Sequence, residues 1–193
     1  MSETSARGSA NSTRGRRTIL LIAAACLAPV VASYAVYYFA PRSAQVNYGT
    51  LLPTVPAPAM EGRTFDGAPF RLADLRGRWV LLAGSAADCG TGCEQMLYAT
   101  RQARTMQGKE RDRVVRVWLD AGAAPLPPGL RDRHPELVVA RVPGRMLDGL
   151  PGALPGIWLV DPLGNLVLRY PPDPDVKGLA NDLARLLRAS GIG

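Results

Sequence analysis

The chain has 193 residues and a formal net charge of +7, with 47% hydrophobic and 20% charged residues. This length accommodates one membrane segment and one globular domain, and two full domains would be crowded. The charge does not indicate a nucleic-acid-binding protein, because the arginines either gather in a short N-terminal tail or alternate with acids, as in Arg131-Asp132-Arg133, and no basic stripe with interleaved aromatic residues exists.

The N-terminal region predicts a membrane anchor. Residues 1–17 contain four arginines and one glutamate and are expected to form a basic cytoplasmic tail. Residues 18–40 carry no charge, and about 20 apolar residues in a helix cross the hydrocarbon layer. The far end of this run is rich in aromatic residues of the kind that favour the membrane interface, namely Tyr34, Tyr37, Tyr38 and Phe39. Cys26 lies inside the run and is expected to be a small apolar filler.

The arginine-rich near end also predicts the orientation. By the positive-inside rule the tail is cytoplasmic and the rest of the chain lies on the periplasmic or extracytoplasmic side of the inner membrane. A cleaved signal peptide ending near Val31-Ala32-Ser33 is the alternative, and it exports the same domain. The uncleaved single-pass anchor is favoured because the apolar run continues into the aromatic cluster.

The exported part divides into a linker and a domain. Residues 41–60 contain four prolines, few charges and no helical period, which predicts an extended linker. Residues 61–193 are expected to form one domain. In it, Asp66-Gly67 between short alternating runs predicts a hairpin over 63–72. The uninterrupted apolar run 79–84 predicts a strand that is buried on both faces.

The remaining pattern predicts the fold class. A helix is expected from about residue 92 to 107, ended by Gly108, with Met96 and Met106 facing the core. Further strands are expected at 114–119, 137–140, 157–160 and 166–170, followed by a last helix with an apolar face between residues 176 and 187. This order predicts an α/β, thioredoxin-like mixed sheet flanked by helices, with one parallel half and one antiparallel half.

The junction between the first buried strand and the following helix holds Cys89 and Cys93. A cysteine at a helix N-terminus has a lowered thiol pKa, because the unpaired amides there carry partial positive charge. Gly90 and Gly92 are expected to let the backbone bring the two sulfurs together. An inert disulfide also accounts for an even pair of cysteines in an exported protein. Redox or metal chemistry is favoured over it, because a structural disulfide usually closes a longer loop.

A metal site needs more ligands than these two cysteines. Two thiolates suit Cu(I), which also accepts a thioether or an imidazole. The third-ligand candidates are Met96, Met146 and His134, the only histidine, although His134 is expected to be a surface loop residue. Structural zinc is disfavoured because no second Cys or His pair has the required spacing.

Pro155 is the third candidate site residue. In thioredoxin-like folds a cis-proline precedes an antiparallel strand and faces the cysteines, and Leu154-Pro155 stands directly before the expected strand 157–160. An ordinary trans proline at the start of a strand is the alternative, since cis bonds are a minority of X-Pro bonds.

Two segments carry a resemblance to a known family. The run from Asp66 to Leu82 followed by Cys89-x-x-x-Cys93, together with Trp158-Leu159-Val160-Asp161-Pro162-Leu163-Gly164, resembles the Sco/SenC branch of the thioredoxin superfamily over residues 60 to 190. That resemblance implies a membrane-anchored copper protein and thiol reductant that assists metallation of cytochrome c oxidase. In Sco proteins a histidine shortly before the late strand completes the copper site, and residues 151–155 contain none. Because of this departure, we expect Cys89 and Cys93 to act primarily as a redox pair, with copper binding as the less favoured role.

These observations lead to one principal hypothesis and two alternatives. We expect a thiol-disulfide protein whose Cys89/Cys93 pair assists cytochrome c oxidase biogenesis, so a thiol-disulfide oxidoreductase is the candidate enzymatic activity. Its expected partners are oxidase subunits or other assembly factors. The alternatives are a Cu(I)-binding assembly chaperone, with copper as the one candidate cofactor, and a non-catalytic assembly scaffold with a structural disulfide.

Overall fold

The computed structural model of the protein describes residues 9–39, 47–85, 90–122 and 124–191. It divides into two compact units, residues 1–45 and 46–193. The first unit consists of helix α1 (Ser9–Phe39), which has Pro29 in its interior. Its segment Gly15–Val36 is long and apolar enough to cross a membrane, and it is the single such helix among the described residues. The N-terminal apolar helix predicted from the sequence is therefore present.

The second unit is built on one eight-stranded sheet with the order β1-β8-β7-β4-β5-β6-β2-β3. Its strands are β1 (Thr50–Pro56), β2 (Glu61–Thr64), β3 (Pro69–Arg71), β4 (Trp79–Ser85), β5 (Val114–Asp120), β6 (Leu137–Arg141), β7 (Gly156–Val160) and β8 (Asn165–Tyr170). The central strands β4, β5 and β6 run parallel, whereas β7, β8 and β1 continue the sheet antiparallel. The predicted mixed, thioredoxin-like sheet is confirmed, including the hairpin of β2 and β3.

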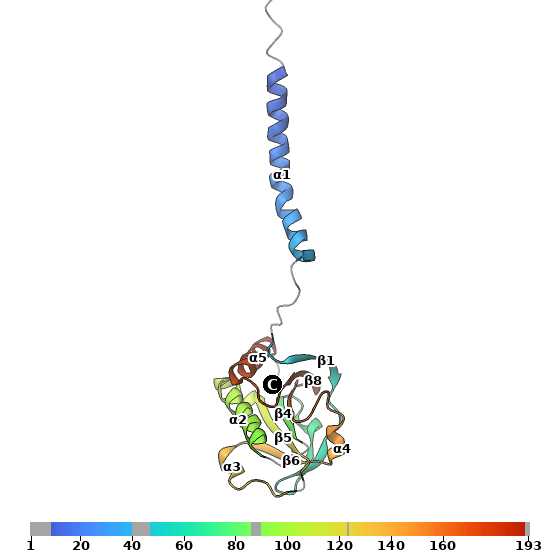
Figure 1. Ribbon diagram of the computed structural model, residues 1–193, viewed down its shortest axis with the longest axis vertical. Helices are drawn as coiled ribbons and strands as arrows, with labels where there is room; N and C mark the ends of the chain where they lie inside the picture. The colour runs from blue at the N-terminus through green and yellow to red at the C-terminus, as the bar shows by residue number, and fades with distance from the viewer. Residues whose placement is uncertain (1–8, 40–46, 86–89, 123, 192–193) are drawn as a thin grey trace, which may run out of the picture. The chain divides into compact units, whose positions relative to one another are not determined.

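Helices cover both faces of this sheet. Helix α2 (Thr91–Thr105) and helix α5 (Val176–Ala189) pack against each other on one face (Figure 1). The short helices are α3 (Leu130–Arg133), α4 (Gly144–Leu147) and the 3-10 turns η1 (Leu72–Leu75) and η2 (Gly108–Arg113). Both faces of strand β4 are buried, because successive side chains of a strand point to opposite faces of the sheet. Leu81 belongs to the cluster under α2 and α5, whereas Leu82 belongs to the cluster on the opposite face. The strand predicted to be buried on both faces is confirmed.

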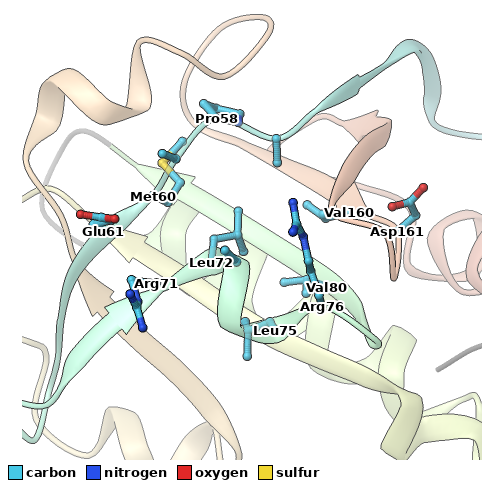
Figure 2. Close-up of a pocket in the computed structure, with 14 residues that line it drawn as sticks. Pro58, Met60, Glu61, Arg71, Leu72, Leu75, Arg76, Val80, Val160 and Asp161 are labelled. Carbon is cyan, nitrogen blue, oxygen red and sulfur yellow. The ribbon is translucent and has the colours of Figure 1, made fainter.

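The structure differs from the expected linker over residues 50–60. These residues are part of the folded unit, because β1 pairs with β8 and the Met60 side chain is 1% exposed. Pro58, Met60 and Glu61 line a cavity of about 200 Å³ together with residues of η1 and β4 (Figure 2). The prolines in β1 are tolerated because the strand lies at the edge of the sheet, where a missing N–H donor costs little.

The residues just before β1 are fixed by helix α5. The buried carboxylate of Asp182, 2% exposed, accepts hydrogen bonds from the backbone N–H groups of Tyr48 (3.1 Å) and Gly49 (2.8 Å). The Tyr48 hydroxyl accepts from the backbone N–H of Asp175 (2.8 Å). Asp175 also caps α5, since its side chain accepts from the N–H groups of Lys177 and Gly178. The folded unit therefore begins by residue 47, well before the expected domain start at residue 61.

Helix α2 confirms one core prediction and contradicts another. Met96 is 0% exposed and lies in the cluster under α2 and α5. Met106 is 55% exposed, so the prediction that it faces the core is wrong. The physical reason is that Met106 is the C-cap residue of α2 and lies beyond Ala103, the last residue of the helix that is buried.

Candidate functional site

Cys93 lies where the central parallel strand meets the first long helix of the domain. Strand β4 ends at Ser85 and α2 begins at Thr91, which places Cys93 in the first turn of α2. Its side chain is 7% exposed, packs in the same cluster as Met96 and Ile157, and is disulfide-bonded. Cys89 lies outside the described residues. The predicted position of Cys93 at a strand-to-helix junction is therefore present.

The first turn of α2 provides amide groups around Cys93. Its N-cap residue is Gly90, whose φ of −92° is extended and which has no side chain to accept from the first N–H groups. The N–H groups at a helix N-terminus carry partial positive charge, which favours a nearby thiolate. Neither Gly90 nor Gly92 adopts a left-handed conformation, and a Cβ at either position would meet nothing within 4 Å. The described backbone thus does not by itself require glycine at these positions. Their expected part in bringing the two sulfurs together involves Cys89, which lies outside the described residues, so it stays a prediction.

Pro155 lies close to the end of β4, from which the chain continues into the cysteine segment. The peptide bond Leu154-Pro155 is cis, so the first of the two alternatives for this proline holds. The register between β4 and β7 pairs Gly84 with Gly156, which places Pro155 beside the end of β4. Two hydrogen bonds hold the segment that leads to it: Trp158 Nε1 donates to the Pro151 carbonyl (2.9 Å) and an Arg169 guanidinium nitrogen donates to the Ala153 carbonyl (2.6 Å).

Asp120 is a buried acid that was not predicted from the sequence. It also lies where β4 ends. It ends β5 directly beside Ser85 in the register of the two parallel strands, and it is 3% exposed. Its carboxylate accepts from the Arg141 guanidinium (2.9 and 3.1 Å) and from the N–H of Gly122 (3.0 Å). The signal in the sequence was an acid directly after a strand that precedes a parallel crossover.

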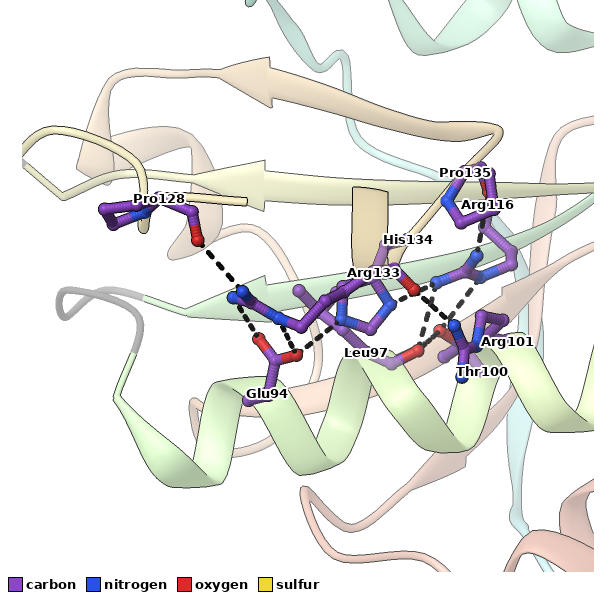
Figure 3. Close-up of polar contacts among 9 residues, drawn as sticks. All are labelled: Glu94, Leu97, Thr100, Arg101, Arg116, Pro128, Arg133, His134 and Pro135. Atoms are coloured by element: carbon purple, nitrogen blue, oxygen red, sulfur yellow. Dashed lines mark hydrogen bonds and ion pairs between the residues drawn. The ribbon is translucent and has the colours of Figure 1, made fainter. Parts of the chain in front are cut away.

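The prediction that His134 is a surface loop residue is wrong. Its side chain is buried, with the residue 3% exposed, because α3 packs it against α2. Figure 3 shows its ring between Glu94 and Arg116. His134 Nε2 is 2.9 Å from Glu94 Oε1, and the same carboxylate accepts from Arg133 Nε (2.9 Å). Arg133 is further held by the Pro128 carbonyl (2.9 Å). Glu94 directly follows Cys93, so this network fixes the turn that carries the cysteine.

The partners of His134 determine its tautomer. An Arg116 guanidinium nitrogen lies 3.4 Å from Nδ1, and a guanidinium only donates, so Nδ1 accepts. A carboxylate only accepts, so Nε2 carries the proton and donates to Glu94. Burial lowers the pKa of His134. The hydrogen bond from Arg133 likewise lowers the pKa of Glu94. The resting network is therefore a neutral imidazole against a carboxylate.

The described residues supply few ligands for a metal at Cys93. Both nitrogens of His134 are engaged, so this ring is not a free ligand. The Met146 sulfur lies 3.5 Å from the N–H of Glu61 and packs against the cluster on the opposite face of the sheet from Cys93. Met96 shares the Cys93 cluster. Within the described ranges no group of three or more His, Cys, Asp or Glu side chains is gathered for a metal ion.

Solved structures confirm the thioredoxin-like fold. The chain is similar to copper-bound ScoI of Arabidopsis thaliana, with a TM-score of 0.57 and 16% identity over 70% of this chain and 100% of that one. It is similar to apo Sco1 of Thermus thermophilus, with a TM-score of 0.54 and 23% identity over 76% and 99%. A thioredoxin domain of a thiol-disulfide oxidoreductase from Bacteroides vulgatus matches with a TM-score of 0.51 and 19% identity over 70% and 99%.

The sequence itself matches one family. No curated protein matches the chain. The family described as "Transmembrane-like, thioredoxin-like, C-terminal domain" matches residues 79–190, which run from the start of β4 to the end of α5 and include Cys93, Asp120 and Pro155. Because this match covers more than half of the chain, the protein belongs to the family of transmembrane-like, thioredoxin-like C-terminal domains.

Proposed function

We propose that the protein is a membrane-anchored thiol-disulfide exchange protein that acts through Cys89 and Cys93. The observation that carries the proposal is the placement of a disulfide-bonded Cys93 in the first turn of α2, next to the end of β4, where Pro155 also lies. Helix α1 would be the single-pass anchor, with its arginine-rich end in the cytoplasm and the domain on the periplasmic side of the inner membrane.

The exchange would proceed in two balanced steps. The Cys89 thiolate attacks one sulfur of a partner's disulfide, which forms a mixed disulfide and releases the partner's other sulfur as a thiolate. The Cys93 thiolate then attacks the Cys89 sulfur, which forms the Cys89–Cys93 disulfide and releases the second partner thiolate. The partner gains two electrons and takes two protons from solvent. The low exposure of Cys93 suits this resolving role, since only an intramolecular sulfur needs to reach it.

The proposed setting is the assembly of cytochrome c oxidase, with oxidase subunits or other assembly factors as partners. It is supported by the Sco-like segments of the sequence and by the similar fold of the Sco structures. In this setting the reduced pair would keep metal-binding thiols of a partner in their reduced state.

Copper(I) binding is the alternative use of the same pair. It is favoured by one observation within the domain: Met96 belongs to the same buried cluster as Cys93, and thiolate and thioether are both soft donors that suit Cu(I). The ligand set would be Cys89, Cys93 and Met96, without His134.

A redox titration of the full chain in neutral detergent tests exchange. We expect the pair to equilibrate with glutathione or dithiothreitol buffers at a potential above about −300 mV, since structural disulfides of exported proteins lie below it. Cys89→Ser and Cys93→Ser should each abolish the transition, whereas the control Cys26→Ala should keep it, because Cys26 is a free cysteine in α1. A potential far below that value would contradict the proposal and leave a structural disulfide.

Two further measurements separate the alternatives. Stoichiometric anaerobic Cu(I) binding that is lost in both Cys89→Ser and Met96→Leu would support the hypothesis that the pair binds copper. In a deletion strain, full recovery of oxidase activity by the double serine variant would favour a scaffold instead of thiol chemistry.

A further inference from the structure

Arg116 is a buried cation without an acidic partner. It lies in the middle of β5, under helix α2, and is 2% exposed. Its guanidinium donates to the Thr100 hydroxyl (3.2 Å), to the backbone carbonyls of Leu97 (3.0 Å) and Pro135 (3.5 Å), and to His134 Nδ1 (3.4 Å). All four acceptors are neutral, and within the described part of the chain Arg116 forms no ion pair. Buried charges in proteins are normally paired, so this arrangement lacks an anion.

A cavity of about 450 Å³ lies beside this guanidinium. It is formed between α2, η2, β5 and the residues that precede β6. Four arginines line it, namely Arg101, Arg104, Arg111 and Arg116, and Glu136 is the one acid in its lining. Glu136 has a φ of 62°, the one positive value among the described residues other than glycine. The cavity is therefore both ligand-sized and strongly positive.

Ion pairs neutralise only part of this charge. Arg104 pairs with Glu136 and lies 3.4 Å from Asp112, which also approaches Arg111 at 3.6 Å. These two acids thus balance two of the four arginines. Arg101 donates to the Arg133 carbonyl and stands over the Tyr98 ring at 5.6 Å. Within the described residues neither Arg101 nor Arg116 forms an ion pair, although the Glu136 charge acts on Arg116 from a longer distance.

The two unbalanced guanidinium groups lie close to each other. Figure 3 shows Arg101 and Arg116 at the same end of the polar network, away from Glu94. Burial lowers the pKa of Arg116 to about 10, and the charges of Arg104 and Arg101 contribute to this shift. The site therefore repels further cations, and an anion with two negative charges would compensate the charges of these two arginines.

We propose that this cavity, which we call the arginine pocket, binds a phosphate group. A guanidinium presents parallel N–H donors that match two phosphate oxygens, and phosphate carries up to two charges near neutral pH. The ligand would be held by Arg101 and Arg111 at the rim and by Arg116 at the base. Its source is either a soluble phosphate compound or the phosphate of an anionic lipid headgroup.

The test is a titration of the full chain in neutral detergent at constant ionic strength. The first arm adds inorganic phosphate, and the second adds short-chain phosphatidylglycerol to the micelles. Calorimetry gives the affinity, and the Nε–Hε NMR signals of the arginines locate the site. We expect saturable binding that shifts Arg101, Arg111 and Arg116, and Arg101→Gln should weaken it about tenfold or more, since a charge-assisted hydrogen bond is lost.

Arg71→Gln is the matched control, because Arg71 is an exposed arginine of β3 that pairs with Asp74 outside the pocket. It should leave the affinity unchanged. Saturation by inorganic phosphate in neutral micelles identifies a soluble ligand, whereas a response to phosphatidylglycerol alone identifies the headgroup. Heats that do not saturate in either arm, shifts spread evenly over surface arginines, or an equal loss in Arg71→Gln would overturn the proposal. Arg111→Gln, at a more exposed position, repeats the test if Arg101→Gln does not fold.

Discussion

His134 Nε2 lies 2.9 Å from Oε1 of Glu94, the residue that directly follows Cys93 in the first turn of α2. This hydrogen bond joins residues 40 positions apart and ties the end of α3 to the turn that carries the cysteine. Arg133 binds the same carboxylate, so the negative charge beside Cys93 is compensated. The conformation of the cysteine turn thus depends on contacts from α3, and the ring nitrogen that would take up a second proton, Nδ1, faces the Arg116 guanidinium.

Stability should therefore fall when the pH is lowered below about 6.5. Burial holds the folded pKa of His134 below its ordinary value of about 6.5, so in this window the unfolded state binds more protons than the folded state. Stability is complete above the unfolded pKa and is lost as the pH falls towards the folded pKa, by at most about 1.4 kcal/mol per pH unit for one proton. Urea unfolding followed by tryptophan fluorescence at pH 5.5 to 7.5 measures the slope.

The control is His134→Gln in the full chain. His134 is the only histidine, so no other side chain has an ordinary pKa between pH 5.5 and 7.5. We expect the variant to be less stable at pH 7.5 but to show a flatter dependence on pH. An unchanged slope would show that His134 does not titrate with unfolding.

The pair of Asp120 and Arg141 supplies a second stability prediction. Removing Arg141 leaves the buried Asp120 carboxylate without its cation at the edge where β4 ends. Because the Arg141 side chain is half-exposed, we expect Arg141→Leu to cost about 2 kcal/mol, less than the loss of a fully buried partner.

Arg71→Leu is the comparison for this pair. Its partner Asp74 is exposed, and exposed pairs contribute about 0 to 1 kcal/mol. Adding Asp120→Asn to Arg141→Leu should restore part of the lost stability, because it removes the uncompensated charge. Equal losses in Arg141→Leu and Arg71→Leu, measured by urea unfolding, would contradict the assignment of Asp120 as a buried charge.

Local pattern predicted most of the sheet but not its first strand. The apolar runs that form β4 and β5 and the turn residues between β7 and β8 are properties of short segments, so they are readable in the sequence. Strand β1 contains Pro53 and Pro56 and is mostly exposed, which locally resembles a linker. It is a strand because its neighbour β8 offers a free edge, and that neighbour lies more than 100 residues away in the chain.

The candidate site shows the same division. The strand-to-helix position of Cys93 follows from local periodicity. The burial of His134 does not, because a polar loop carries no local sign that Glu94 and Arg116, on two other elements, will surround it. The sequence indicates only that Asp120 lies at the end of a strand. Its burial and its ion pair could not be predicted, because its partner Arg141 comes from the next parallel strand.

Asp182 should be essential for the start of the folded unit. In Asp182→Ala the backbone N–H groups of Tyr48 and Gly49 lose a charged acceptor in a buried position. We expect a loss of about 3 kcal/mol, since hydrogen bonds to charged groups contribute about 1.5 to 3 kcal/mol each and are not additive. Asp173→Ala, at an exposed position just before α5, is the control and should change stability by less than about 0.5 kcal/mol. A loss in Asp182→Ala no larger than that of the control would refute this role.

Gly178 tests the same attachment by steric means. A Cβ at this position in α5 would lie 2.6 Å from Cγ of Tyr48, and the ring cannot easily retreat because it stacks on Tyr170 and its hydroxyl accepts from Asp175. Alanine is ordinarily about 1 kcal/mol better than glycine inside a helix. We expect the opposite here, with Gly178→Ala losing about 1 to 3 kcal/mol through overpacking.

A double-mutant cycle with Tyr48→Leu isolates that contact. The smaller side chain removes the ring, so in the Tyr48→Leu background Gly178→Ala should be neutral or should gain up to about 1 kcal/mol. Urea unfolding of the four proteins gives the coupling energy between the two positions. If Gly178→Ala were stabilising with Tyr48 present, the ring would not rest on this helix, and Asp182 alone would hold the first residues of the folded unit.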